Sequence, residues 1–266
     1  MTQADENYED IVMDITRNGF AHETRLGAAY VLPSLNVTLT DFPLLTTKKI
    51  NWKNVVIELL WFLRCEKQTR FMLRHGVKIW EPWTDEYGVV ECPYGWYWDD
   101  QVAEIVHELE VNPQSRRMVL TAWDPSSHSV YSRQLVPCHM SLTVNVIGGK
   151  LYGHLFQRSC DVGIGLPYNW ASYWLLLELF GRASGYPVAQ LTHSIANAHI
   201  YEPHVEPLLE QIERCSFEQP KLWLDEGAEK CLVDPGWSDD VSTEFLMSFF
   251  EIDYESHPHV PLEVLA

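Results

Sequence analysis

The sequence gathers a thiol, an arginine, a carboxylate and an amide within about thirty residues, as Cys138, Arg158, Asp161 and Asn169. A thiolate is a strong nucleophile, and the other three groups can hold an anionic ligand by charge and hydrogen bonds. This combination predicts a site in which an anionic, hydrogen-bonding ligand lies against a nucleophile.

Two candidate catalytic side chains also have ordinary structural explanations. A free cysteine is commonly a small buried hydrophobe, and Cys138 becomes reactive only if His139 and a cationic pocket lower the pKa of its thiol. Glu58 lies within the apolar run 55–62, where a carboxylate is costly unless it is paired or does chemistry. It can instead face water on the surface of a helix. The residues alone leave both alternatives open.

Length and composition predict one globular domain, residues 1–266. A chain of 266 residues with 46% apolar and 12% aromatic content can bury a large core, and no repeat or long linker divides it. No apolar run approaches the roughly 18 residues of a membrane span, and the first residues are acidic where a signal peptide is basic. We therefore expect a cytoplasmic protein that does not bind membranes.

The net charge of -18 argues against binding to nucleic acid, because such binding needs a surplus of basic residues along one face. An anionic ligand must find a local basic pocket, which scattered arginines could form by converging in space. The six cysteines include no CxxC pair and no metal-ligand spacing. We therefore expect neither disulfides nor a metal site.

Hydrophobic spacing predicts an α+β domain. Helices are expected over 8–16, 52–63, 168–183 and, on the surface, 204–214, with an acidic helix near Gln101. Strands are expected over 140–146, 151–156 and 190–195. Gly148 and Gly149 stand between the first two strands and predict a hairpin turn.

Seven segments together resemble the thymidylate synthase family, which includes the deoxypyrimidylate hydroxymethylases. They follow one another in family order and cover nearly the whole chain, from about residue 8 to residue 266: 42–49, 58–63, 115–117, 137–139, 157–161, 166–173 and 199–201. The resemblance implies a single thymidylate synthase-like domain. Its mixed β-sheet would be flanked by helices and packed against a second copy in a homodimer.

The resemblance also implies transfer of one carbon from 5,10-methylenetetrahydrofolate, the cosubstrate, to C5 of dUMP. That carbon is a poor nucleophile until a thiolate adds at C6, the step that matches Cys138. Glu58, with Tyr94 and ordered water, matches the proton-handling group. Asn169 matches the residue that stabilises the enolate and pairs with the uracil edge. Relatives that take cytosine carry aspartate there, so Asn169 favours uracil.

The nucleotide site is likewise implied by matching positions. Its phosphate would lie among guanidinium groups, of which Arg116 and Arg117 arrive from the second subunit. The alternative for these two arginines is a solvated basic turn. His199 and Tyr201 match the positions that hold the sugar 3′-hydroxyl, and their alternative is a polar pair at the end of a strand. The full set is Arg25, Arg116, Arg117, Gln157, Arg158, Ser159, Asp161, Asn169, His199 and Tyr201.

The folate-facing wall would combine aromatic faces that stack the pterin with a carboxylate that accepts its N–H groups. For each tryptophan the alternative is a place in the core. The matching residues are Trp80, Trp83, Asp161, Ile164, Gly165 and Tyr168.

Departures from the synthase pattern bear on the last step. The loop 24–29 lacks the synthase motif Asp-Arg-Thr-Gly-Thr-Gly, and 51, 64–67 and 196–199 differ as well. The passage from 94–98 to the acidic helix is short, as in the hydroxymethylase branch, and the tail 260–266 ends in a small side chain. In the family, expulsion of the folate leaves an exocyclic methylene at C5 of the ring, and a changed loop and tail would admit water to it.

Water would give 5-hydroxymethyl-dUMP, and the chain would then be a deoxyuridylate hydroxymethylase. Hydride transfer from the folate would instead give dTMP and dihydrofolate, as in a thymidylate synthase. A dCMP hydroxymethylase and an inactive nucleotide-binding homologue are further alternatives.

Overall fold

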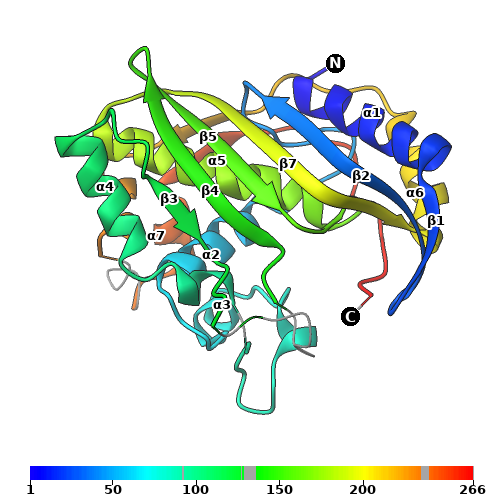
Figure 1. The fold of residues 1–266 in the computed structure, drawn as a ribbon, viewed down its shortest axis with the longest axis horizontal. Coiled ribbons are helices and arrows are strands. Elements are labelled where there is room, and N and C mark those ends of the chain that lie inside the picture. Colours follow the sequence, from blue (N-terminus) through cyan, green and yellow to red (C-terminus); the bar gives the residue numbers. More distant parts are fainter. Residues whose placement is uncertain (92, 127, 129–135, 235–239, 266) are drawn as a thin grey trace.

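The computed structural model describes residues 1–91, 93–126, 128, 136–234 and 240–265 (Figure 1). Its centre is a seven-stranded sheet in the order β1-β2-β7-β5-β4-β3, with β6 beside β7. A second sheet pairs β8 with β9. The strands are β1 Phe20–Thr24, β2 Gly27–Leu39, β3 Val119–Thr121, β4 His139–Ile147, β5 Lys150–Gln157, β6 Cys160–Asp161, β7 Val188–Tyr201, β8 Lys221–Leu224 and β9 Phe250–Asp253.

Helices and short 3₁₀ turns connect the strands. The helices are α1 Gln3–Asn18, α2 Trp52–Leu63, α3 Arg70–Arg74, α4 Gln101–Val111, α5 Gly165–Ser184, α6 Glu202–Ile212 and α7 Thr243–Met247. The 3₁₀ turns are η1 Glu81–Trp83, η2 Tyr94–Tyr97 and η3 Ala228–Leu232. No helix among these described residues has the length and apolarity needed to cross a membrane.

The sheet is mixed, as predicted, because β5 and β6 each pair with β7 in parallel while the other pairs are antiparallel. β7 pairs with β5 in parallel and with β2 in antiparallel fashion. Helix α5 connects β6 to β7 and lies behind the sheet (Figure 1), where most of its residues are buried. The predicted hairpin between β4 and β5 is confirmed, with Gly148 and Gly149 both at positive φ, the backbone that a tight two-residue turn requires.

The opposite face of the sheet carries polar and partly exposed side chains. Along β5 the burial alternates, so Leu151 and Leu155 face the helices while His154 and Phe156 face away. His154 Nε2 lies 2.8 Å from Ser194 Oγ, and Ser194 donates a hydrogen bond of 2.6 Å to Asn36. This face therefore offers both hydrogen-bonding groups and an exposed aromatic ring.

Several predicted boundaries need correction. α1 and α5 are longer than predicted at both ends, and β7 continues six residues beyond 195, to Tyr201. α6 begins at Glu202, with Pro203 in its first turn, and His204 is buried rather than on the surface. The hairpin of β1 and β2 was not predicted, because Pro33 and the positive φ of Ser34 interrupt the alternation in β2.

A substitution at Gly95 tests how closely η2 packs against α2. A Cβ at this position would overlap the backbone of Phe62, which no side-chain movement can relieve. We expect Gly95→Ala to lower the free energy of unfolding by at least about 3 kcal/mol in urea titrations. Gly148→Ala is the matched control: it meets open space and should cost only about 1–2 kcal/mol, from its left-handed backbone. Equal losses would contradict the packing argument.

Candidate active site

Cys138 lies directly before β4, next to the residue that follows β5. Because β4 and β5 form a hairpin in which His139 pairs with Gln157, Cys138 and Arg158 become neighbours. The Arg158 guanidinium donates to the carbonyls of Pro137 (2.9 Å) and Val136 (2.7 Å), and its Nη2 lies 3.5 Å from Cys138 Sγ. The backbone N–H of Arg158 also donates to the Cys138 carbonyl, at 2.9 Å. These contacts fix the thiol against a cation.

The electrostatics of Cys138 only partly match the expected activation. Burial raises the pKa of the Cys138 thiol, and the positive charge of Arg158 opposes that rise. Burial lowers the pKa of His139 to about 4, so this imidazole is neutral and supplies no charge. His139 instead stacks on Tyr94, with ring centroids 4.5 Å apart. The cation beside the thiol is thus Arg158, and the expected contribution from His139 is wrong.

Tyr94 contacts the same segment from η2. Its hydroxyl accepts a hydrogen bond of 3.2 Å from the backbone N–H of Cys138. Its ring is buried between the rings of Phe62 on α2 and Trp80, at 5.4 and 5.7 Å. α2 therefore positions Tyr94, and Tyr94 in turn fixes the backbone of Cys138.

Glu58 lies on α2 and is partly exposed, within an apolar helix face. Its carboxylate accepts a 2.6 Å hydrogen bond from Trp80 Nε1. Desolvation raises the pKa of Glu58 to about 7, although the bond from Trp80 opposes the rise. Burial raises the pKa values of Tyr168 and Tyr173, and the nearby Glu58 carboxyl adds to both rises. Glu58 is thus a partly exposed carboxyl that is held by Trp80 and has a pKa raised towards neutrality.

Asn169 enters the site from the first turns of α5. Its Nδ2 donates to Gln157 Oε1 at 3.2 Å, and Gln157 Nε2 donates to the Ser159 carbonyl at 2.9 Å. Asn169 and Gln157 are both buried. This chain of bonds fixes the orientation of the two amides at the end of β5.

Asp161 begins the turn into α5. Its Oδ1 accepts from the backbone N–H groups of Gly163 (2.8 Å) and Ile164 (3.2 Å), which leaves Oδ2 for a ligand. Ile164, Gly165 and Tyr168 are partly exposed at this end of the helix. The turn and the start of α5 therefore present one carboxylate oxygen beside apolar surface.

The two predicted folate-facing tryptophans differ in access. Trp80 is 7% exposed, and its N–H donates to Glu58. This environment agrees better with a core residue than with a ring that stacks on a ligand. Trp83 is partly exposed and packs edge-on against Trp80, with centroids 5.8 Å apart. Trp83 is therefore the indole with an accessible face.

His199 and Tyr201 lie two residues apart on β7, with ring centroids at 5.1 Å. His199 pairs with Asp161 of β6 in the sheet, and its Nδ1 lies 2.9 Å from Asn197 Oδ1. The charges of Asp161, Arg25 and Cys138 all act on the pKa of Tyr201, although burial is the main cause of its rise. Arg25, in the two-residue turn after β1, thus lies near the same end of β7.

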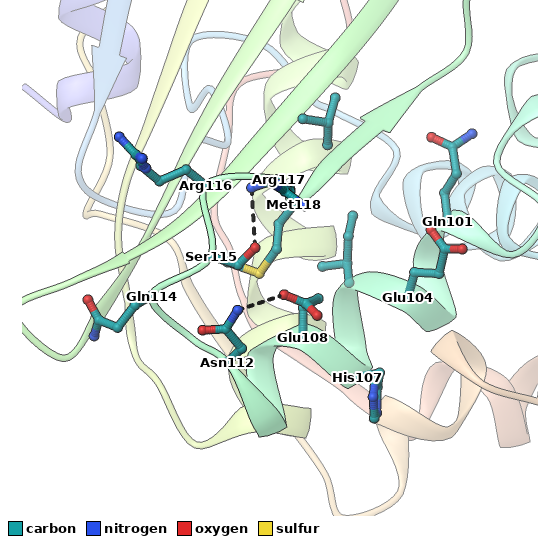
Figure 2. Close-up of a pocket in the computed structure, with 12 residues that line it drawn as sticks. Gln101, Glu104, His107, Glu108, Asn112, Gln114, Ser115, Arg116, Arg117 and Met118 are labelled. Carbon is teal, nitrogen blue, oxygen red and sulfur yellow. Dashed lines mark hydrogen bonds between the residues drawn. The ribbon is translucent and has the colours of Figure 1, made fainter.

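Arg116 and Arg117 lie elsewhere. Figure 2 shows both on the segment between α4 and β3, at a pocket of about 850 Å³. In the sheet, Val119 pairs with Thr143, five residues along β4 from Cys138, which is about 17 Å. Both arginines precede Val119, so they lie still farther away. They do not reach the Cys138 site of the same chain.

Lys48 was given no role from the sequence, although the segment 42–49 was singled out. Its buried Nζ donates to the Gly163 carbonyl at 2.6 Å and lies 3.2 Å from the Tyr8 hydroxyl. Burial lowers the pKa of Lys48 to about 7. The signal that could have identified it is a lysine that closely follows the apolar residues Leu44 and Leu45.

A protein-family model described as thymidylate synthase matches residues 6–266. The chain belongs to the thymidylate synthase family. Membership assigns it to one-carbon transferases that use a reduced folate. The match to the thymidylate synthase family includes every residue placed above, so the resemblance drawn from the seven segments is confirmed.

The raised pKa of Glu58 makes stability depend on pH. A carboxyl with a folded pKa near 7 and an unfolded pKa near 4.3 favours folding while protonated, and this contribution is lost as pH rises to 7 and above. Glu58→Gln should remove this pH-dependent loss of stability, because the amide does not titrate. Urea titrations at about pH 5 and about pH 8 measure the effect. Between these two pH values the free energy of unfolding should fall by about 2–3 kcal/mol more in the wild type than in Glu58→Gln. Parallel pH profiles would contradict a desolvated Glu58.

Proposed function

We propose that the protein transfers one carbon from 5,10-methylenetetrahydrofolate to C5 of dUMP and releases 5-hydroxymethyl-dUMP. The observation that carries the proposal is the fixed geometry of Cys138, with Arg158 at its sulfur and Tyr94 at its backbone. A thiol held in this way against a cation suits a nucleophile that adds reversibly to a ring carbon.

Cys138 starts the proposed reaction. Its thiolate, stabilised by Arg158, bonds to C6 of the uracil ring, and the electron pair of the C5–C6 double bond moves towards O4. Asn169 stabilises the negative charge at O4, because its amide is already oriented by Gln157. The resulting enolate makes C5 nucleophilic, and C5 bonds to the methylene carbon of the folate. Loss of the C5 proton and cleavage of the C–N bond then release tetrahydrofolate and leave an exocyclic methylene on the ring. Water adds to this methylene, and the C6–S bond breaks, which restores the C5–C6 double bond and returns the Cys138 thiolate.

Glu58 moves protons in this scheme. With a pKa of about 7, its carboxyl exists in both protonation states near neutral pH. It can therefore donate a proton and accept one at different steps, through ordered water where it does not touch the ring. The Trp80 bond holds one of its oxygens in place.

The folate supplies the one-carbon unit at the oxidation level of formaldehyde. The free Oδ2 of Asp161 suits the N–H groups of a pterin, while the partly exposed rings of Trp83 and Tyr168 suit its faces. Ile164 and Gly165 complete the apolar side. These donors and surfaces fit a reduced folate.

The nucleotide phosphate is assigned to the Nη1 end of Arg158, to Ser159 and to Arg25. Three of the five N–H donors of Arg158 serve the backbone and the thiol, which leaves Nη1 for an anion. His199 and Tyr201 face the sugar 3′-hydroxyl. Arg116 and Arg117 are too distant in one chain, which supports their delivery by the second subunit of a homodimer across the open sheet face.

Two features favour a hydroxymethyl product over a methyl product. The β1–β2 turn around Arg25 is a two-residue hairpin closed by Thr24, whose hydroxyl donates to the Gly27 carbonyl at 2.7 Å, in place of the synthase loop. The C-terminal tail also differs from that of the synthases. Both changes lie where water must be excluded for hydride transfer. Thymidylate synthesis is the second candidate, supported by the description of the matching family model.

Covalent trapping tests the nucleophile. With methylenetetrahydrofolate present, 5-fluoro-dUMP should form an adduct that mass spectrometry places on Cys138, because fluorine cannot leave C5 as a proton does. Cys138→Ser should abolish the adduct and lower turnover by at least about 10³-fold. Cys215→Ser, at an exposed cysteine, should change neither. Full activity in Cys138→Ser would overturn the assignment.

Product analysis tests the last step and the base. Mass spectrometry of both products should give 5-hydroxymethyl-dUMP with tetrahydrofolate; dTMP with dihydrofolate would instead establish the synthase reaction. Asn169→Asp should shift preference towards dCMP by at least about tenfold in kcat/KM, because a protonated carboxyl can match the cytosine edge. Unchanged preference would exclude Asn169 from base selection.

A further inference from the structure

The end of the chain lies against the turn that presents Asp161. Val260 is buried, and Leu262 packs against the hydrophobic core. The carbonyl of Glu263 accepts a hydrogen bond of 2.9 Å from Nε2 of His204 on α6. Residues 260–263 are therefore docked and are not a free terminus.

The imidazole of His204 is held in one tautomer by this bond. A carbonyl oxygen can only accept, so Nε2 carries the proton and, in the neutral ring, Nδ1 is an acceptor. His204 is 1% exposed, and among the described residues its Nδ1 has no hydrogen-bond partner. The tail bond is thus the hydrogen bond that orients this buried ring.

Gly163 provides the space in which the tail and the ring meet. A Cβ there would lie 3.2 Å from His204 Nδ1, 3.2 Å from Leu262 Cδ1 and 3.3 Å from Asp161 Oδ1. All three distances are tighter than ordinary contact, and Gly163 itself is fixed by bonds from Lys48 and to Asp161. Its φ is not left-handed, so the backbone accepts alanine and only these side-chain contacts would suffer.

We infer that His204 and Gly163 form a seat for residues 260–263, and that the seated tail holds Asp161 in the orientation that binds the folate. His204 is a positioning residue: it acts through the Glu263 carbonyl and Leu262, not on the reacting atoms. The coupling to folate rests on the proposed function, whereas the seat itself does not. Loosening the seat should also increase the access of water to the site.

Hydrogen exchange tests the seat without any turnover. Backbone amides of Val260 and of residues 262–265 should exchange about two- to tenfold faster in His204→Phe, the range expected when one neutral hydrogen bond is lost. Gly163→Ala and Leu262→Ala change the other two partners in this contact and should also speed the exchange of these amides. His204→Gln keeps an Nε2 donor and should restore slow exchange. His259→Phe, at an exposed histidine of the same tail, is the matched control.

Unchanged exchange in Gly163→Ala and Leu262→Ala would overturn the seat, whether or not His204→Phe folds. Steady-state kinetics then test the coupling: the variants should raise KM for methylenetetrahydrofolate about two- to tenfold, leave KM for dUMP unchanged, and recover in His204→Gln. Faster exchange with an unchanged folate KM would overturn the coupling alone. If exchange is faster in the variants but the wild type turns over neither dUMP nor dCMP, the seat is supported and the proposed function is wrong.

Discussion

The guanidinium of Arg158 holds together the segment on which the whole site depends. Its Nε binds the carbonyl of Pro137, and its Nη2 binds the carbonyl of Val136 and reaches the sulfur of Cys138. A point charge on a flexible stem could not make these three contacts at once, because they need a planar fork with several donors. The geometry requires the start of β4 and the end of β5 to lie side by side, which the short hairpin at Gly148 secures.

Burial shifts the pKa values of several groups in and around the site. Burial raises the pKa of Cys138 and of Glu58, and lowers the pKa of Lys48 and of His139. Each shift favours the neutral form of the group, whereas Arg158 at the sulfur supplies a positive charge.

Periodicity and motifs predicted the class of fold and the main residues of the site, but not their partners. α2 and the β4–β5 hairpin follow from local signals, namely an apolar run and a Gly-Gly turn. The role of Arg158 beside the thiol, rather than His139, depends on which strand ends adjoin, and this is a long-range property. Burial of His204 and Lys48 was equally hidden, since both residues are usually exposed and only tertiary contacts bury them.

The pairing of β2 with β7 also sets the order in which a newly made chain can complete its sheet. Ala29 pairs with Tyr201, so the longest ladder of the protein joins segments separated by about 170 residues. At about 5–20 residues per second, synthesis of the intervening chain takes about 10–35 s, during which β2 has an unpaired edge. The ribosome-bound chain therefore carries an open strand for most of its synthesis, a period in which chaperone binding would compete with aggregation.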